Sequence, residues 1–168
     1  MSSTIRIGIV GAGDNTRLHH IPGLRKQDSV EIVSVCNRRL ESSQKVAKEF
    51  SIPKIHTDWK TLISSDEIDA VVIGTWPYLH CPITLAALDA GKHVMTEARM
   101  AMNAQEARLM LEKSKMNPQL VTQIVPSPIT LQIDRMVQKL IAENFLGEIL
   151  ALDVKSNSTS FIDFSSSL

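Results

Sequence analysis

The sequence has only two cysteines, no net charge and no long hydrophobic run among its 168 residues. Because lysine and arginine (18) balance aspartate and glutamate (18), charge gives no reason to expect nucleic acid or an anionic membrane surface as a partner. The apolar runs fall far short of the roughly 20 residues that a membrane span requires. Cys36 and Cys81 are too few for a disulfide framework or a zinc site, so we expect no metal.

The N-terminal residues lack a basic stretch followed by a long apolar one, so we expect no secretion signal. Together with the scarcity of cysteine, this favours a reduced, cytoplasmic protein. What the sequence does contain, 43% hydrophobic and 21% charged residues, is normal for a globular protein that buries a core. The length suits one domain of ordinary size.

Short apolar and β-branched runs alternate with helical patterns along the chain. We expect strands at residues 5–10, 30–36, 70–74, 93–96 and 120–125. We expect one helix after Ser42-Ser43, which would cap its start, and another over 82–90 that ends at Gly91. Two more are expected around 107–114 and over 133–141, the latter with Pro128 in its first turn. This alternation predicts an α/β fold, a doubly wound parallel sheet of the Rossmann type.

A glycine turn, Gly11-Ala12-Gly13, follows the first expected strand. Glycine lets the backbone turn tightly and approach a pyrophosphate, which the N–H groups at the next helix start would hold. The third glycine of the G-x-G-x-x-G pattern is replaced by Thr16, whose side chain would push the helix away or bond a phosphate. We therefore predict a dinucleotide site that includes Gly11, Gly13, Asn15 and Thr16; the alternative is an ordinary strand–turn–helix pair of glycines.

The segment after this turn contains Pro22, which removes a backbone donor, so we expect a helix that is short or kinked near residues 18–22. His19 and His20 lie in this segment. Adjacent histidines do not make a metal site, and we expect them to be packed or to face solvent.

The end of the second expected strand indicates which dinucleotide binds. A free ribose 2′-hydroxyl usually meets an acidic residue there, whereas a 2′-phosphate meets arginine. Asn37, Arg38 and Arg39 occupy this position, with serines nearby. Guanidinium groups pair well with phosphate, so the sequence favours NADP(H) over NAD(H). The alternatives are that the arginines are only exposed loop charges and that Glu41 serves a ribose.

Several segments, in this order, resemble the Gfo/Idh/MocA oxidoreductases. They are the glycine turn, the T-W-P-Y-L-H stretch at 75–80, the A-L-D-A-G-K-H-V-M-T-E stretch at 87–97 and F-L-G-E-I at 145–149. The resemblance covers about residues 5–155. The family includes glucose–fructose oxidoreductase and inositol dehydrogenase. The resemblance implies hydride transfer between a nicotinamide ring and a carbinol or carbonyl carbon, often of a sugar or polyol.

Carried over by position, the resemblance implies that Thr75, Trp76, Pro77 and His80 line the cofactor site. It implies that Glu97 bonds the nicotinamide end of the cofactor. His80, Glu97 and Arg99 are the residues that we expect near the chemistry. For His80 the alternative is a packed residue at a helix start, and for Cys81 a buried cysteine is favoured over an activated thiol.

Two departures from the family bear on catalysis. The glutamate-lysine-proline motif reads Glu97-Ala98-Arg99, and alanine cannot supply the cation or the proton transfer that the family's lysine provides. Arg99 can hold a polarised substrate but is a poor proton acceptor. The second departure is the length of the chain, which ends where the family's second domain would begin. We expect residues 1–146 to form the dinucleotide-binding domain. We expect residues 147–168, with a strand at 148–155, to form the truncated start of an α+β substrate domain.

These observations lead to one favoured hypothesis and two alternatives. The favoured one is the cofactor-binding part of an NADP-dependent oxidoreductase that is inactive as this chain alone. The first alternative is a regulatory module that binds a dinucleotide without turning it over. The second is an assembly role in which the strand at 148–155 pairs between chains. Whether the protein forms a homo-oligomer, and which small molecule is the substrate, stay open.

Overall fold

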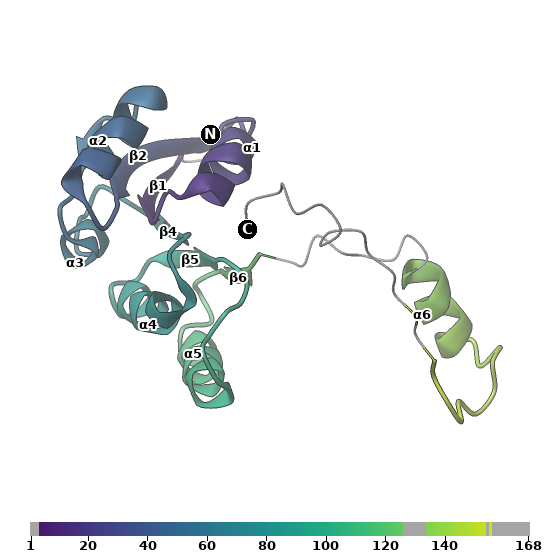
Figure 1. Cartoon of the computed structure of the whole chain (residues 1–168). Helices are drawn as coiled ribbons and strands as arrows, with labels where there is room; N and C mark the ends of the chain where they lie inside the picture. Colours follow the sequence, from purple (N-terminus) through teal and green to yellow (C-terminus); the bar gives the residue numbers. More distant parts are fainter. Residues whose placement is uncertain (1–3, 126–133, 154, 156–168) are drawn as a thin grey trace. The chain divides into compact units, whose positions relative to one another are not determined.

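The computed structural model describes residues 4–125, 134–153 and 155, which fall into two units that we describe separately. The larger unit is built on a six-stranded parallel sheet with the strand order β3-β2-β1-β4-β5-β6 (Figure 1). This is the strand order of the Rossmann fold, so the predicted fold class is confirmed. The strands are β1 (Ile5–Val10), β2 (Val30–Cys36), β3 (Lys54–Ile55), β4 (Ala70–Ile73), β5 (His93–Thr96) and β6 (Thr122–Ile124).

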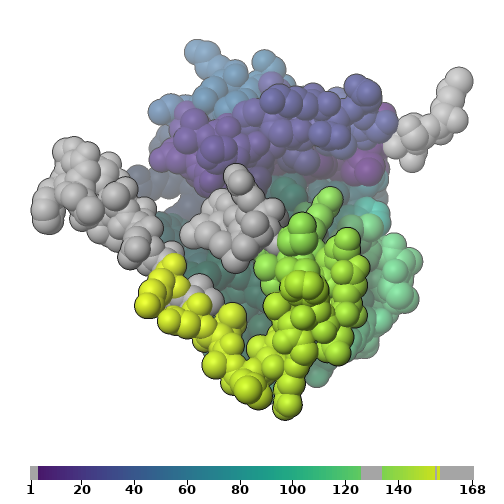
Figure 2. Space-filling model, turned by 90° about the vertical axis from the view of Figure 1, so that its right-hand side faces the viewer, coloured from purple at the N-terminus to yellow at the C-terminus, as the bar shows by residue number. Residues whose placement is uncertain are grey.

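Helices cover both faces of the sheet because neighbouring residues of each strand point to opposite sides. On one face Ile9 and Val35 pack against α1 (Ile21–Leu24) and α2 (Leu40–Glu49). On the other face Val10 and Val71 pack against α3 (Trp59–Ile63) and α4 (His80–Asp89). Figure 2 shows the purple-to-blue residues of the first half gathered apart from the teal residues of the second half, as two Rossmann halves would be.

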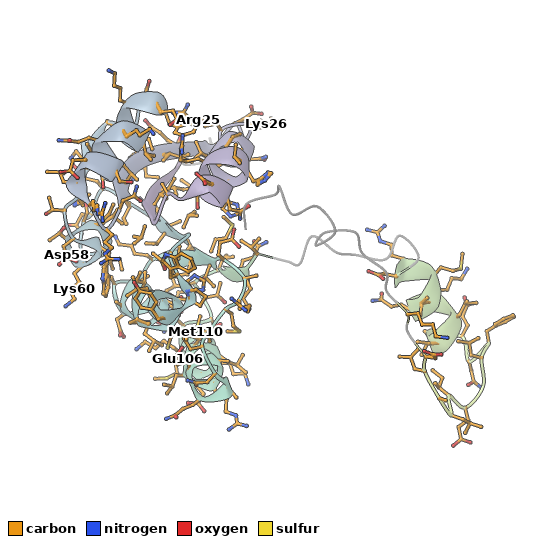
Figure 3. All side chains as sticks on the ribbon, in the orientation of Figure 1. Arg25, Lys26, Asp58, Lys60, Glu106 and Met110 are labelled. Atoms are coloured by element: carbon orange, nitrogen blue, oxygen red, sulfur yellow. The ribbon has the colours of Figure 1, made fainter. Side chains whose placement is uncertain are left out.

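The helix α5 (Ala104–Met116) starts with a reciprocal cap. Asn103 Oδ1 accepts from the Glu106 N–H at 2.9 Å, and the Glu106 carboxylate accepts from the Met102 N–H at 3.0 Å. Figure 3 labels Glu106 and Met110 on this helix, and Met110 is the one residue of α5 that is buried. Leu109 and Leu111 are exposed, so α5 buries little of its apolar surface.

Some local predictions were wrong or incomplete. Ser42 and Ser43 lie inside α2, which begins at Leu40 with Arg39 as its N-cap residue. Ser43 Oγ does not cap the helix start; it accepts from the Asn37 N–H at 2.8 Å. The structure adds β3 and α3, and it shortens the last strand to Thr122–Ile124. The chain near Pro22 is confirmed as irregular: a π-helical turn, η1 (Thr16–His20), leads into the four residues of α1.

The smaller unit contains the amphipathic helix α6 (Asp134–Ala142), which confirms a helix close to the predicted range. Pro128, expected in its first turn, lies outside the described residues. The strand expected at 148–155 is not formed at residues 148–153 or at 155, and Val154 lies outside the described residues. A strand requires a hydrogen-bonding neighbour, and none of the described residues pairs with this segment.

Candidate functional site

A cleft of about 890 Å³ lies at the carboxyl ends of the parallel strands in the larger unit. Segments that follow β1, β2, β4 and β5 form its walls, and residues before and at the start of α3 complete it. Ligands of open α/β sheets bind at this edge, where the strand order reverses between β1 and β4. The residues predicted from the sequence that line the cleft are Gly11, Gly13, Asn15, Thr16, Asn37, Arg38, Arg39, Thr75, Trp76 and Glu97.

The two glycines of the turn have different reasons to be glycine. Gly11 has a φ of +86°, and a Cβ there would lie 2.6 Å from the backbone nitrogen of Thr75. Gly11 therefore allows the turn after β1 to lie close against the segment after β4. A Cβ at Gly13 would meet no protein atom within 4 Å, and Gly13 lines the cleft. The protein itself does not require glycine at this position, so the open space suits the close approach of a ligand.

Thr16, in the place of the third glycine, is accommodated by a glycine elsewhere. Its side chain is buried, and Oγ1 donates to the Gly11 carbonyl at 3.1 Å. A Cβ at Gly74 would lie 2.1 Å from this Oγ1, so the missing Cβ of Gly74 provides the room that Thr16 fills. The hydroxyl thus stabilises the turn, which differs from the phosphate contact considered from the sequence.

The tip of β2 is held against the glycine turn by Asn37. Its Oδ1 accepts from the Ala12 N–H at 2.6 Å, and its Nδ2 donates to Ser42 Oγ at 2.9 Å. Arg38 and Arg39 follow with exposed side chains. Within the described part of the chain neither arginine has an ion-pair partner, so both guanidinium groups are available to an anion in the cleft.

A carboxylate and a thiol also line this part of the cleft. The side chain of Asp14 is 90% exposed and lies 3.4 Å from Arg17 Nη1. Burial raises the pKa of the Cys36 thiol to about 11, with a smaller contribution from Asp58. Cys36 is therefore a neutral thiol near pH 7, and it resembles Cys81, whose pKa burial also raises. The favoured interpretation of Cys81 as a buried, unactivated cysteine fits this result.

The segment after β4 presents two aromatic side chains to the cleft. Trp76 is 75% exposed and Tyr78 is 54% exposed, and both line the cleft together with Thr75. Pro77 begins the 3-10 turn η2 (Pro77–Leu79) and does not line the cleft. These aromatic residues stand at the surface although most of the large apolar residues of β4 and α4 are buried.

His80 lies behind the cleft wall and is fully buried. Its Nδ1 lies 2.8 Å from the carbonyl oxygen of Arg99, and its Nε2 lies 2.9 Å from the carbonyl oxygen of Thr75. The ring therefore connects the segments that follow β4 and β5. Because both ring nitrogens face backbone carbonyls, this arrangement matches the packed role that the sequence left open.

Glu97 follows β5, and its carboxylate contacts three nitrogen atoms. One carboxylate oxygen contacts both Asn15 Nδ2 and His20 Nε2, and the other accepts from the Ala98 N–H at 3.0 Å. His20 was not predicted as a site residue, since it is 77 residues from Glu97 in sequence and carries no local signal. Arg99 is exposed and does not line the cleft, and the peptide bond between Ala98 and Arg99 is cis.

No group of three or more histidine, cysteine, aspartate or glutamate side chains among the described residues is arranged to hold a metal ion. No helix in the described ranges is both long enough and apolar enough to cross a membrane.

The fold agrees with that of known proteins of similar sequence and structure. The model of an oxidoreductase family with an NAD-binding Rossmann fold, GFO_IDH_MocA, matches residues 5–123. The chain belongs to this family. The expected resemblance is therefore confirmed over most of the larger unit, and the chain is a Gfo/Idh/MocA oxidoreductase sequence with the family's nucleotide-binding fold.

Three individual proteins illustrate the similarity. The 4-carboxy-2-hydroxymuconate-6-semialdehyde dehydrogenase of Sphingobium sp. is 33% identical over 111 residues, 66% of this chain and 35% of that enzyme. The structure of scyllo-inositol dehydrogenase from Lactobacillus casei with NAD(H) and scyllo-inositol has a TM-score of 0.74 at 22% identity, covering 87% of this chain and 43% of that one. A 3-ketoreductase from Actinomadura kijaniata in complex with TDP-benzene and NADP has a TM-score of 0.71 at 24% identity, covering 88% and 45%.

The chain spans between about a third and a half of the length of these relatives. The similarity of the two solved structures concerns the fold. Their cofactors, NAD(H) in one and NADP in the other, show that both dinucleotides occur among proteins of this fold.

Proposed function

We propose that this chain binds a nicotinamide dinucleotide in the cleft, with NADP(H) preferred over NAD(H). We further propose that it is the cofactor-binding part of an enzyme that moves a hydride to or from a carbinol or carbonyl carbon of a sugar- or polyol-like substrate. The observation that carries the proposal is that one cleft is lined both by Gly13, where there is open space, and by Arg38 and Arg39, which form no ion pair within the described ranges. Membership of the family supports the hydride chemistry.

Each wall of the cleft suits one part of the cofactor. The turn at Gly13 and Asn15 would hold the pyrophosphate, since backbone N–H groups at a helix start bind anions. Arg38 and Arg39, after β2, would pair with a 2′-phosphate. Thr75, Trp76 and Glu97, after β4 and β5, would lie at the nicotinamide end. When bound, the nicotinamide ring supplies or accepts the hydride.

The residues around Glu97 limit what this chain does alone. No lysine is found among the described residues that line the cleft, and Ala98 stands where the family's lysine would be. Arg99 can hold an anionic or polarised substrate, but its high pKa makes it a poor proton acceptor. We propose that residues 147–168 begin a substrate domain that completes the site, and that the present chain by itself is inactive.

The preference for NADP(H) is tested by titration followed through tryptophan fluorescence. Trp59 and Trp76 are the two tryptophans of the sequence, and both line the cleft. Replacing Arg38 and Arg39 by alanine should weaken NADP⁺ binding about tenfold or more and change NAD⁺ binding by about twofold, since a guanidinium–phosphate pair is a charge-assisted hydrogen bond. Arg108→Ala, in the exposed side of α5, is the matched control. Equal losses for both cofactors would contradict the preference.

A second candidate is a regulatory module that binds the dinucleotide without turning it over. The absence of a proton-transferring lysine at Ala98 favours it. Both candidates predict saturable binding, so they are separated by turnover of the complete protein. Steady hydride transfer to any member of a sugar and polyol panel would exclude the regulatory module, whereas binding without turnover across the panel would favour it.

A further inference from the structure

His80 is a fully buried histidine that does not line the proposed cofactor cleft. It is the first residue of α4. The helix is fixed in the core, because Ile83, Ala87 and Leu88 pack in one cluster with residues of β4 and β5 (Figure 1). The imidazole therefore stands on a rigid part of the larger unit, and it can hold in place the segments that it contacts.

Each ring nitrogen of His80 faces a backbone carbonyl oxygen of a different segment. Nδ1 lies 2.8 Å from the Arg99 oxygen, and Nε2 lies 2.9 Å from the Thr75 oxygen. Both distances are within the hydrogen-bonding range. Because a carbonyl oxygen can only accept, any proton in these contacts comes from the ring. One side chain thus spans the segment after β4 and the segment after β5.

The segment after β5 depends on this contact. As far as Glu97 the chain is held by the sheet, since the Glu97 N–H donates to the Ile73 carbonyl at 3.0 Å. Among residues 98–101, which follow, one hydrogen-bonding contact with another element is found within the described ranges, that of the Arg99 carbonyl with His80. The Arg99 carbonyl is therefore the point at which His80 holds this segment to the core.

We infer that His80 is a positioning residue for the nicotinamide half of the cofactor. The inference rests on the proposed function, in which Thr75, Trp76 and Glu97 lie at the nicotinamide end. The ring contacts the chain at Thr75 and again two residues beyond Glu97, so it sets how far apart these two walls of the cleft stand. His80 acts through these segments and does not line the cleft itself.

The half of the cleft proposed for the adenosine and the pyrophosphate is held by other contacts. Thr16 Oγ1 donates to the Gly11 carbonyl at 3.1 Å, and Asn37 Oδ1 accepts from the Ala12 N–H at 2.6 Å. Neither contact involves α4. Replacing His80 should therefore weaken the binding of the nicotinamide ring and leave the binding of the rest of the cofactor nearly unchanged.

The test compares two ligands that differ only in the nicotinamide ring, NADP⁺ and 2′-phospho-ADP-ribose, in fluorescence titrations of the full chain. The native protein should bind NADP⁺ about tenfold more tightly. In His80→Leu, which has no ring nitrogen, this ratio should fall to about twofold or less, because one hydrogen-bonding contact is lost. The affinity for 2′-phospho-ADP-ribose should stay within about twofold of the native value. If NAD⁺ is the better ligand, NAD⁺ and ADP-ribose form the equivalent pair.

Two further variants each keep one of the two contacts. The side-chain amide of His80→Asn reaches about as far as Nδ1 and can donate to the Arg99 carbonyl. The amide of His80→Gln reaches about as far as Nε2 and can donate to the Thr75 carbonyl. At least one of these variants should bind NADP⁺ within about threefold of the native protein. Thermal unfolding of each variant gives the temperature below which the titrations are made.

Trypsin digestion tests the contact in the native chain and does not depend on any variant. Arg99 is exposed, but the carbonyl of the bond that trypsin would cut is held at His80. Cleavage after Arg99 should therefore be slower than cleavage after Lys26, which is exposed in the turn that follows α1 (Figure 3). In His80→Leu, cleavage after Arg99 should become about tenfold faster, and cleavage after Lys26 should not change.

Several results would overturn the inference while leaving cofactor binding intact. They are an equal loss of affinity for both ligands in His80→Leu, an unchanged affinity for NADP⁺ in that variant, no recovery in either amide variant, and rapid cleavage after Arg99 in the native protein. Equal affinities of the native protein for the two ligands would also overturn it, because the cleft would then hold no nicotinamide ring. Failure of the native protein to bind any of the four ligands would instead overturn the proposed function and, with it, the inference.

Discussion

Restoring the third glycine of the motif, Thr16→Gly, should destabilise the protein. The Thr16 side chain is 1% exposed, its hydroxyl donates to the Gly11 carbonyl, and it fills the space left by Gly74. The substitution removes a hydrogen bond worth about 1 kcal/mol. It also leaves a small void worth about 1 kcal/mol and adds the backbone entropy of a glycine, about 1 kcal/mol. The expected total is a loss of about 2–3 kcal/mol in the free energy of unfolding.

Urea unfolding, followed by tryptophan fluorescence, measures this loss. Thr16→Ser is the matched variant, because it keeps the hydroxyl and loses only a methyl group, at a cost of about 1 kcal/mol. Gly74→Ala approaches the same contact from the other side: its Cβ would lie 2.4 Å from the Gly11 carbonyl oxygen and 2.1 Å from Thr16 Oγ1. It should also destabilise the protein, by about 1–3 kcal/mol, through overpacking. A Thr16→Gly variant as stable as the native protein would show that the Thr16 side chain does not stabilise the turn.

Three further predictions concern charge and ionisation. The Arg6 guanidinium, which is hydrogen-bonded to Asp69, lowers the pKa of that carboxyl from its ordinary 3.8. The interaction therefore stabilises the folded protein above about pH 4, and this stabilisation is lost as the pH falls through the lowered pKa. Asp69→Asn should therefore lower the thermal midpoint at pH 7, and its difference from the native protein should shrink below pH 4. The pKa of Cys36 is about 11, against an ordinary 9.0, so this thiol should react with a disulfide reagent at pH 8 about a hundredfold more slowly than a free thiol. The rate is measured in a variant in which Cys81 is replaced by serine. A rate like that of free cysteine would contradict the burial of Cys36. Asp14→Asn removes an exposed carboxylate from the cleft and should strengthen NADP⁺ binding about threefold, whereas Glu112→Gln, on the exposed side of α5, should not change it.

The sequence was sufficient to predict the parts of the fold that depend on local patterns. The runs at Ile5–Val10, Val30–Cys36 and His93–Thr96 are short, β-branched and bounded by turns, and each forms a strand with the expected ends. The glycine turn was predictable for the same reason, because its context between a strand and a helix is local. β3 was missed, since two residues carry no periodicity.

The features that the sequence could not reveal depend on contacts between distant segments. Thr16 is tolerated because Gly74, at the end of another strand, has no side chain. His20 meets Glu97 because parallel strands bring their carboxyl ends to one edge of the sheet. Asn37 was predicted to bind the cofactor; it lines the cleft, and its amide also links the glycine turn to α2, which the sequence did not indicate. A polar residue at a strand end has the same sequence signal in either role.

Gly13→Ala shows whether the cleft at the glycine turn holds a dinucleotide. A Cβ at Gly13 meets no protein atom within 4 Å, so the variant should fold and unfold like the native protein. Gly23, in α1, also has open space at its Cβ position but does not line the cleft, and Gly23→Ala is therefore the control. In a fluorescence titration with NADPH, we expect saturable binding to the native protein and to Gly23→Ala, and an affinity at least about tenfold weaker for Gly13→Ala. Equal binding by both variants would contradict it.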